Sequence, residues 1–163
     1  MKLLLTANGL SNPVIQQAFL DLTGNTTDLT VAFIPTAGDS IEWVTDPADS
    51  KKFTVKLLKQ NNAEEGKSYL TYTQKGYDVM VVDLTGDTKE IEEKLKRADI
   101  IDVGGGDVNY LLDWAKKAKL GDYLKDVLHS GVVYVGASAG SMLLNPDIGF
   151  TWWEPDRSED RVG

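Results

Sequence analysis

The sequence predicts an α/β protein with a three-layer, doubly wound and mostly parallel sheet. Two observations support this prediction: short apolar runs recur along the chain, and helix-like segments alternate with them. The 163 residues suit a single domain, and the 42% hydrophobic and 26% charged content is ordinary for a globular protein. No repeat, low-complexity stretch or linker divides the chain, so we expect one domain over residues 1–163.

Five apolar runs are the expected strands. They are nearly continuous rather than alternating, which is typical of parallel strands that are covered on both faces. Their Val, Ile and Leu content favours buried strands over exposed ones. The runs are Lys2–Ala7, Leu29–Ile34, Asp78–Leu84, Asp99–Val103 and Val132–Gly136.

Helix-like segments lie between these runs. The first begins with Asn12 as a good N-cap and Pro13 at the first helical position. The stretch Gly38–Asp49 has no such pattern, and we expect a long loop there, at the end of a strand where α/β proteins place ligand contacts. The helix-like segments are Pro13–Leu22, Phe53–Leu58, Tyr69–Tyr77, Thr88–Ala98, Val108–Lys117 and Leu120–His129.

Composition excludes several classes of function. Lys+Arg 17 against Asp+Glu 25 gives a formal net charge of −8 without a basic run, which argues against nucleic-acid binding. No apolar stretch approaches the roughly 20 residues of a membrane span. The apolar run at the N-terminus is too short for a signal peptide and is interrupted by Asn8-Gly9, so it predicts a buried first strand. The absence of cysteine and the single histidine leave no thiolate or histidine-cluster metal site. We expect a soluble, cytoplasmic protein without a cofactor or metal.

The strongest functional signal is a serine turn, Gly136-Ala137-Ser138-Ala139-Gly140, which follows an apolar strand. In the context of a strand followed by a helix, Gly-x-Ser-x-Gly is typical of a nucleophile elbow. The glycines leave room for a sharp turn that lifts the serine hydroxyl above the sheet, and the Ala139 amide can then donate to an oxyanion. The alternative is a glycine-rich turn that only packs closely or holds a phosphate.

A second turn, Gly104-Gly105-Gly106, follows the preceding strand. Consecutive glycines permit positive φ and a close approach of the backbone to a ligand. Because neighbouring parallel strands end at the same edge, we expect one of these amides to complete an oxyanion hole beside Ser138. A dinucleotide-binding pattern, Gly104-x-Gly106-x-x-Asn109, is the alternative, but it lacks the third glycine and the following acidic residue.

Taken together, the two turns resemble those of the peptidase E family, which comprises serine peptidases, including aspartyl dipeptidases, and their cyanophycinase relatives. The resemblance implies a class I glutamine-amidotransferase-like fold without its final strands. It also implies a serine-type, dipeptidase-like activity on small peptides, including peptides with an N-terminal Asp. The likeness covers nearly the whole chain, through Leu3–Thr6, Phe33–Ala37, Val103–Asp107, Gly136–Gly140 and Asn145-Pro146.

The same resemblance implies roles for individual residues. Ser138 takes the place of the nucleophile, and Gly106 and Ala139 take the oxyanion-hole positions. Family members can carry a third triad acid in the segment that corresponds to the tail of this chain. Glu154 and Asp156 are the candidates there, with Asp156 as the working choice, and solvated loop carboxylates are the alternative.

Three further residues bear on the site. The family usually has Asn after its glycines, whereas this chain has Asp107, so we expect that carboxylate to face away or to tune the site differently. Trp43 and Asp46 in the long loop are candidates for lining a substrate pocket. For Trp43, a local hydrophobic plug is an equal alternative.

The catalytic base is missing from the expected place. A serine hydroxyl needs a base to accept its proton, and the family's histidine follows the serine by some tens of residues. The single histidine here, His129, precedes the strand that ends at Ser138, roughly 20 Å away at about 3.3 Å per residue. Three explanations are a truncated product, a second chain that supplies the histidine, and a non-catalytic binding module. An unfinished sheet edge would also favour a homo-oligomer.

Overall fold

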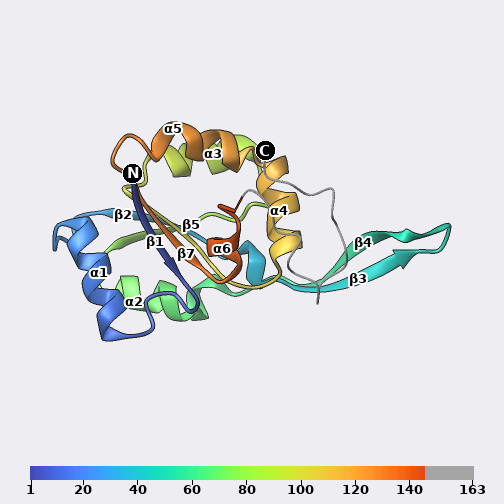
Figure 1. The fold of residues 1–163 in the computed structure, drawn as a ribbon, viewed down its shortest axis with the longest axis horizontal. Helices are drawn as coiled ribbons and strands as arrows, with labels where there is room; N and C mark the ends of the chain where they lie inside the picture. The colour runs from blue at the N-terminus through green and yellow to red at the C-terminus, as the bar shows by residue number, and fades with distance from the viewer. Residues whose placement is uncertain (146–163) are drawn as a thin grey trace.

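The structure is a computed structural model that describes residues 1–145, except for the side chains of residues 49–53 and 65. Its centre is a five-stranded parallel sheet with the strand order β1-β7-β6-β2-β5. Figure 1 shows these strands side by side, with helices on both faces. The strands are β1 (Lys2–Thr6), β2 (Thr30–Ile34), β5 (Asp78–Val81), β6 (Ile100–Val103) and β7 (Val133–Ala137), which confirms all five expected runs.

The strand order explains the three layers. From β1 through β2 to β5 the chain moves in one direction across the sheet, and from β5 through β6 to β7 it returns. Right-handed crossovers that run in opposite directions place their helices on opposite faces. The helices are α1 (Pro13–Thr23), α2 (Lys67–Lys75), α3 (Thr88–Lys96), α4 (Val108–Lys117), α5 (Leu120–Val127) and α6 (Ala139–Met142).

Local sequence signals set the helix ends. The Asn12 side chain accepts a hydrogen bond from the Ile15 amide at 3.0 Å, Pro13 occupies the first turn, and Gly24 ends α1 in the left-handed region. The break between α4 and α5 falls at Lys119, with φ 55°, between the two helix-like segments expected there.

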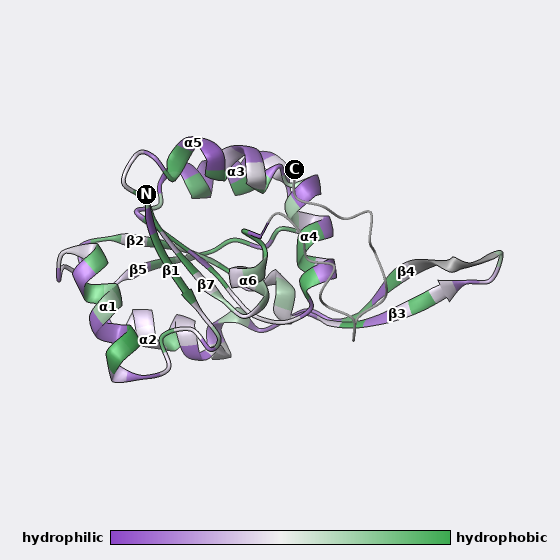
Figure 2. Ribbon diagram, in the orientation of Figure 1, coloured by the Kyte–Doolittle hydropathy of each residue, from purple (hydrophilic) through white to green (hydrophobic). Residues whose placement is uncertain are grey.

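Two apolar cores lie on either side of the sheet, and Figure 2 shows the central strands as largely hydrophobic. Under α1 and α2, three aromatic rings pack edge to face, with 5.6 Å between the centroids of Phe19 and Tyr72 and 5.8 Å between those of Phe19 and Tyr77. The other core, under α3, α4 and α5, includes Ile34, Leu95 and Leu111.

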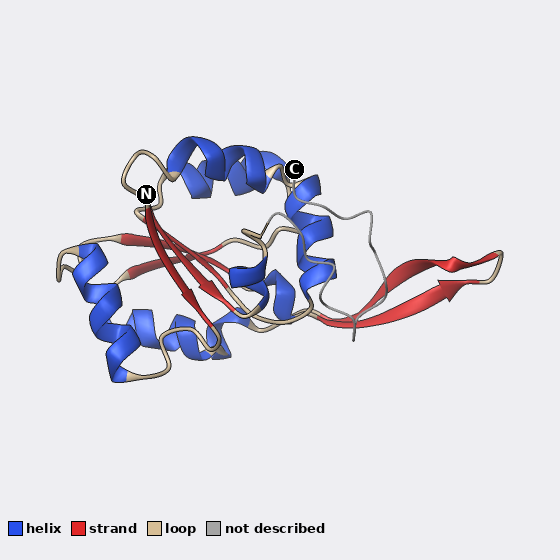
Figure 3. Cartoon of the chain, viewed as in Figure 1, coloured by secondary structure: helices blue, strands red, loops and turns tan. Residues whose placement is uncertain are grey.

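The long second connection differs from the prediction. Residues 38–49 are not a loop, and Phe53–Leu58 is not helical: β3 (Ser40–Asp46) and β4 (Asp49–Lys59) form an antiparallel hairpin. We call this hairpin, Ser40–Lys59, the arm, and Figure 3 shows it projecting beyond the sheet. The short 3₁₀ turns η1 (Thr36–Gly38) and η2 (Ala63–Glu65) flank it. The prediction failed because the pairing of two strands, not local propensity, determines this segment.

Candidate active site

Ser138 lies immediately after the last residue of β7 and has an unusual backbone conformation. Its φ is 49° and its ψ is −110°, a sparsely populated region for any residue with a side chain. Its side chain is partly exposed, although its neighbours Ala137 and Ala139 are buried. The turn therefore holds a strained serine at the surface of the domain, as the elbow pattern predicts.

The two flanking glycines make this turn sterically feasible. A β-carbon at Gly136 would lie 2.8 Å from the carbonyl of Gly140, because α6 folds directly back over the end of β7. A β-carbon at Gly140 would lie 2.0 Å from the Val103 carbonyl oxygen, so α6 also packs against the end of β6. The buried Tyr134 hydroxyl donates to the Gly140 carbonyl at 2.6 Å and holds this turn from below.

The end of β1 is hydrogen bonded to the serine turn. The Ser138 amide donates to the Thr6 carbonyl at 2.9 Å. Ser141 Oγ donates to the same carbonyl at 2.8 Å and accepts from the Thr6 amide at 3.0 Å. These positioning contacts were not predicted, because they join residues about 135 positions apart and only the pairing of β1 with β7 brings them together.

The glycine turn lies beside the serine turn, as expected from adjacent parallel strands. A β-carbon at Gly105 would lie 3.1 Å from Ser138 Cβ. Gly106 has φ 148°, and its own β-carbon would lie 1.7 Å from the Ala37 carbonyl oxygen. Within residues 1–145, the amides of Gly106 and Ala139 donate to no other residue. Two unused backbone donors therefore lie on the two turns that meet at Ser138.

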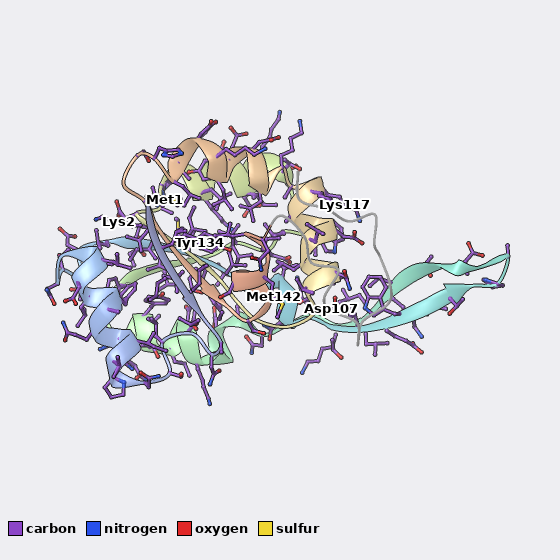
Figure 4. The ribbon with its side chains drawn as sticks, viewed as in Figure 1. Met1, Lys2, Asp107, Lys117, Tyr134 and Met142 are labelled. Carbon is purple, nitrogen blue, oxygen red and sulfur yellow. The ribbon has the colours of Figure 1, made fainter. Side chains whose placement is uncertain are left out.

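Asp107 is half-buried, and each of its two carboxylate oxygens accepts a hydrogen bond. One carboxylate oxygen caps α4 by accepting from the Tyr110 amide at 2.8 Å, and the other accepts from Trp43 Nε1 at 2.6 Å. Figure 4 shows Asp107 at the start of α4, where the arm leaves the domain. Both oxygens are thus engaged by donors, and Trp43 joins the arm to the glycine turn.

A second carboxylate fixes the root of the arm. Asp39 is buried and accepts from the Asn61 amide at 2.8 Å and from the Tyr110 hydroxyl at 3.1 Å. Burial raises the pKa of Asp39 from its ordinary value, and these two hydrogen bonds partly oppose that rise. Burial of the Tyr110 hydroxyl, together with the neighbouring Asp39, raises the pKa of Tyr110 to about 12. The two ends of the arm are therefore tied to each other and to α4, which follows the glycine turn.

Asp102 on β6 is fully buried beneath the glycine turn. One of its oxygens accepts from the Tyr72 hydroxyl at 2.7 Å, and the other has no hydrogen-bond partner among the described residues. Burial raises the pKa of Asp102 to about 7, and the Tyr72 hydrogen bond opposes that rise only in part. Because burying a charged carboxylate without a cation is costly, the buried site favours the protonated form of Asp102.

Other predicted residues lie elsewhere. Asp46 is near the tip of the arm, where it accepts from the Ala48 amide at 2.8 Å, so it does not reach Ser138. His129 follows α5 at the opposite end of β7 from Ser138 and lines an apolar groove of about 460 Å³. Within residues 1–145 nothing hydrogen bonds to the Ser138 hydroxyl. Glu154 and Asp156 lie outside the described residues.

Comparison with known proteins agrees with this geometry. The family model for "Peptidase family S51" matches residues 3–156, nearly the whole chain. The chain belongs to peptidase family S51. The elbow and the glycine turn are thus features of a member of this family, and the family is that of serine peptidases.

Relatives of this S51 chain are named as peptidases. An uncharacterized peptidase of Pasteurella multocida is 28% identical over 153 residues, covering 92% of this chain and 63% of the relative. An uncharacterized peptidase of Listeria monocytogenes is 29% identical over 133 residues, covering 81% of this chain and 56% of the relative. This chain therefore spans about three fifths of the length of these curated relatives.

Solved structures share the fold. The crystal structure of a candidate peptidase E from Listeria monocytogenes matches with a TM-score of 0.70 and 24% identity, covering 100% of this chain and 71% of that one. A peptidase from an acI-B1 Actinobacterium matches with a TM-score of 0.56 and 21% identity, covering 90% and 57%. The likeness confirms the class I glutamine-amidotransferase-like fold.

Residues 1–145 hold no group of three or more His, Cys, Asp or Glu side chains arranged to bind a metal ion. None of the helices in that range is both long and apolar enough to cross a membrane.

Proposed function

We propose that this protein is a serine-type peptidase that cleaves small peptides through Ser138. The observation that carries the proposal is the strained conformation of Ser138, with φ 49° and ψ −110°, at the end of β7. A protein keeps such strain where the surrounding structure over-determines it, and this happens most often at active sites. Membership of peptidase family S51 supports the same reaction class.

The proposed reaction is acyl transfer. Ser138 Oγ attacks the carbonyl carbon of the scissile peptide bond, and its proton passes to a base. The amides of Gly106 and Ala139 donate to the oxygen that becomes negative, because they have no other acceptor within residues 1–145. The C–N bond then breaks, the amine leaves with the proton from the base, and water hydrolyses the acyl-enzyme.

The base is proposed to lie outside residues 1–145. His129 is the single histidine of the sequence and lies at the far end of β7 from Ser138. A base must come within about 3 Å of the hydroxyl, directly or through one water. We propose a histidine from a longer form of the protein or from a second chain. Asp156 is proposed as the acid that orients it, by resemblance to the peptidase E family.

The substrate class rests on the same resemblance. Small peptides, including peptides with an N-terminal Asp, are the proposed substrates. The alternative is a non-catalytic module that binds peptides without turnover, and the observation that favours it is the Ser138 hydroxyl without a hydrogen-bond acceptor in residues 1–145.

A fluorophosphonate probe tests the proposal, because it reacts with activated serine hydroxyls. We expect labelling of Ser138, located by peptide mass analysis, and faster labelling when imidazole is added as an external base. Ser138→Ala should abolish the labelling. Ser130→Ala, which changes an exposed serine after α5, is the matched control and should leave it unchanged. No labelling of the wild type, even with imidazole, would favour the binding module.

A further inference from the structure

The arm has two chemically different faces. In an antiparallel pair, alternate residues and their direct partners share a face. Ile41 pairs with Leu57 and Trp43 pairs with Val55, so these four apolar side chains lie on one face of the arm. We call this the apolar face. The opposite face carries the charged pair Glu42 and Lys56, whose charged groups are 3.5 Å apart, together with Val44 and Thr54.

The apolar face begins at the candidate active site. Trp43 on this face donates through Nε1 to Asp107 at 2.6 Å, and Asp107 directly follows Gly106. One residue further back, Gly105 lies against Ser138. The arm is therefore joined to the glycine turn at Trp43, and the same turn lies against Ser138.

The arm is anchored rather than loosely attached. Asp39 ties its start to Asn61 beyond its end, and the Asn61 side chain donates to the Pro35 carbonyl at 3.3 Å. An isolated two-stranded hairpin is only marginally stable in water, so these polar contacts at the root stabilise its position. Despite this anchoring, Leu57 on the apolar face remains 47% exposed. Ile41, Trp43 and Val55 on the same face are half-buried, so the anchored arm presents partly accessible apolar side chains.

The dimensions of the arm decide between two kinds of partner. The seven residues of β3 span roughly 23 Å at about 3.3 Å per residue, and two strands about 4.8 Å apart give a face roughly 10 Å wide. The resulting area of roughly 230 Å² falls well below the roughly 800 Å² that each partner buries in a stable protein–protein interface. It does match an extended peptide of about seven residues. A second copy of the chain docked on this face alone would be held too weakly.

We propose that the apolar face of the arm binds an extended, apolar segment of the peptide substrate, beyond the residues that lie at Ser138. Alternate apolar side chains of that segment contact Ile41, Trp43, Val55 and Leu57. No charged side chain occurs among the described residues of this face, so the site favours apolar residues there. This inference rests on the proposed peptidase function and adds that the substrate extends well past the scissile bond.

The test compares matched variants on the two faces of the arm. In a Ser138→Ala background, which cannot form an acyl-enzyme, binding is measured by fluorescence anisotropy. The probes are a labelled octapeptide with Leu at alternate positions and the same peptide with Ser at those positions. We expect the Leu peptide to bind more tightly, and Leu57→Ser to weaken its binding about tenfold. Val44→Ser, on the opposite face and 39% exposed, should change it less than twofold.

Further measurements separate the explanations. Ile41→Thr, which keeps a β-branched residue, provides a second variant should Leu57→Ser unfold the arm, and it too should weaken binding of the Leu peptide. Equal binding of the two peptides, or equal effects of Leu57→Ser and Val44→Ser, would overturn the proposal. So would a change of oligomeric state in Leu57→Ser by sedimentation, because it assigns the face to a second copy. Fluorophosphonate labelling of Ser138 bears on the peptidase function alone, since that small probe does not reach the arm.

Discussion

Replacing Asp102 with Asn should remove a large part of the pH dependence of stability. Asp102 is fully buried, and its pKa is raised from 3.8 to about 7 in the folded state. Because the folded protein holds this proton more tightly than the unfolded chain, stability falls as the pH rises from about 4 to about 7. The shift of about 3 pKa units corresponds to about 4 kcal/mol in total, of which about 2.5 kcal/mol is lost between pH 5 and pH 8.

The assay is urea denaturation of the wild type and Asp102→Asn at pH 5 and pH 8. Asn leaves its amide without a full set of partners, which costs a fixed amount at every pH. The stability of the variant relative to wild type should therefore rise by about 2.5 kcal/mol from pH 5 to pH 8, whatever its absolute value. Tyr72→Phe removes the donor that opposes the rise in the pKa of Asp102, so it should move the transition to higher pH. A stability difference between wild type and Asp102→Asn that does not change with pH would refute the reasoning.

Two further predictions concern the turns of the site. In urea denaturation, the free energy of unfolding of Ser138→Gly should exceed that of Ser138→Ala by about 1 kcal/mol, because glycine tolerates φ 49° and ψ −110° without strain. Equal stabilities of the two variants would show that the turn is not strained. Gly106→Ala should cost about 2 kcal/mol or more and slow labelling of Ser138 at least tenfold, because its β-carbon would meet the Ala37 carbonyl. The control is Gly121→Ala in α5, where the added β-carbon meets no other atom, and its stability should rise slightly. Similar effects of Gly106→Ala and Gly121→Ala would contradict the steric argument.

Much of the fold was predictable because it depends on local or periodic signals. The five parallel strands are continuous apolar runs, and their ends were expected to within a few residues. Asn12 and Pro13 fix the start of α1 by a capping hydrogen bond and a fixed φ, both of which are local effects. The place of Gly105 beside Ser138 was also predictable, because parallel neighbours end at the same edge.

The arm was missed, although a signal for it exists. Ile41 and Trp43 flank the polar Glu42, and Val55 and Leu57 flank Lys56; this short period of two favours strands. Phe53–Leu58 lies between two expected strands, where α/β proteins usually have a helix, and the sequence therefore predicts a helix there. Only the pairing of β3 with β4 decides between these conformations, since strand propensity depends on the neighbours.

Short-range signals in the chain specify the fold class, the order of the elements and the position of Ser138 on its turn, because apolar periodicity, caps and glycine spacing act over short distances. It also identified Asp107 as a departure from the family's pattern, but not what holds its carboxylate. The tertiary structure alone decided that Trp43 donates to Asp107 and that Asp102 is buried against Tyr72. These contacts join residues 64 and 30 positions apart. Their geometry follows from strand order and packing, which no local pattern in the chain specifies.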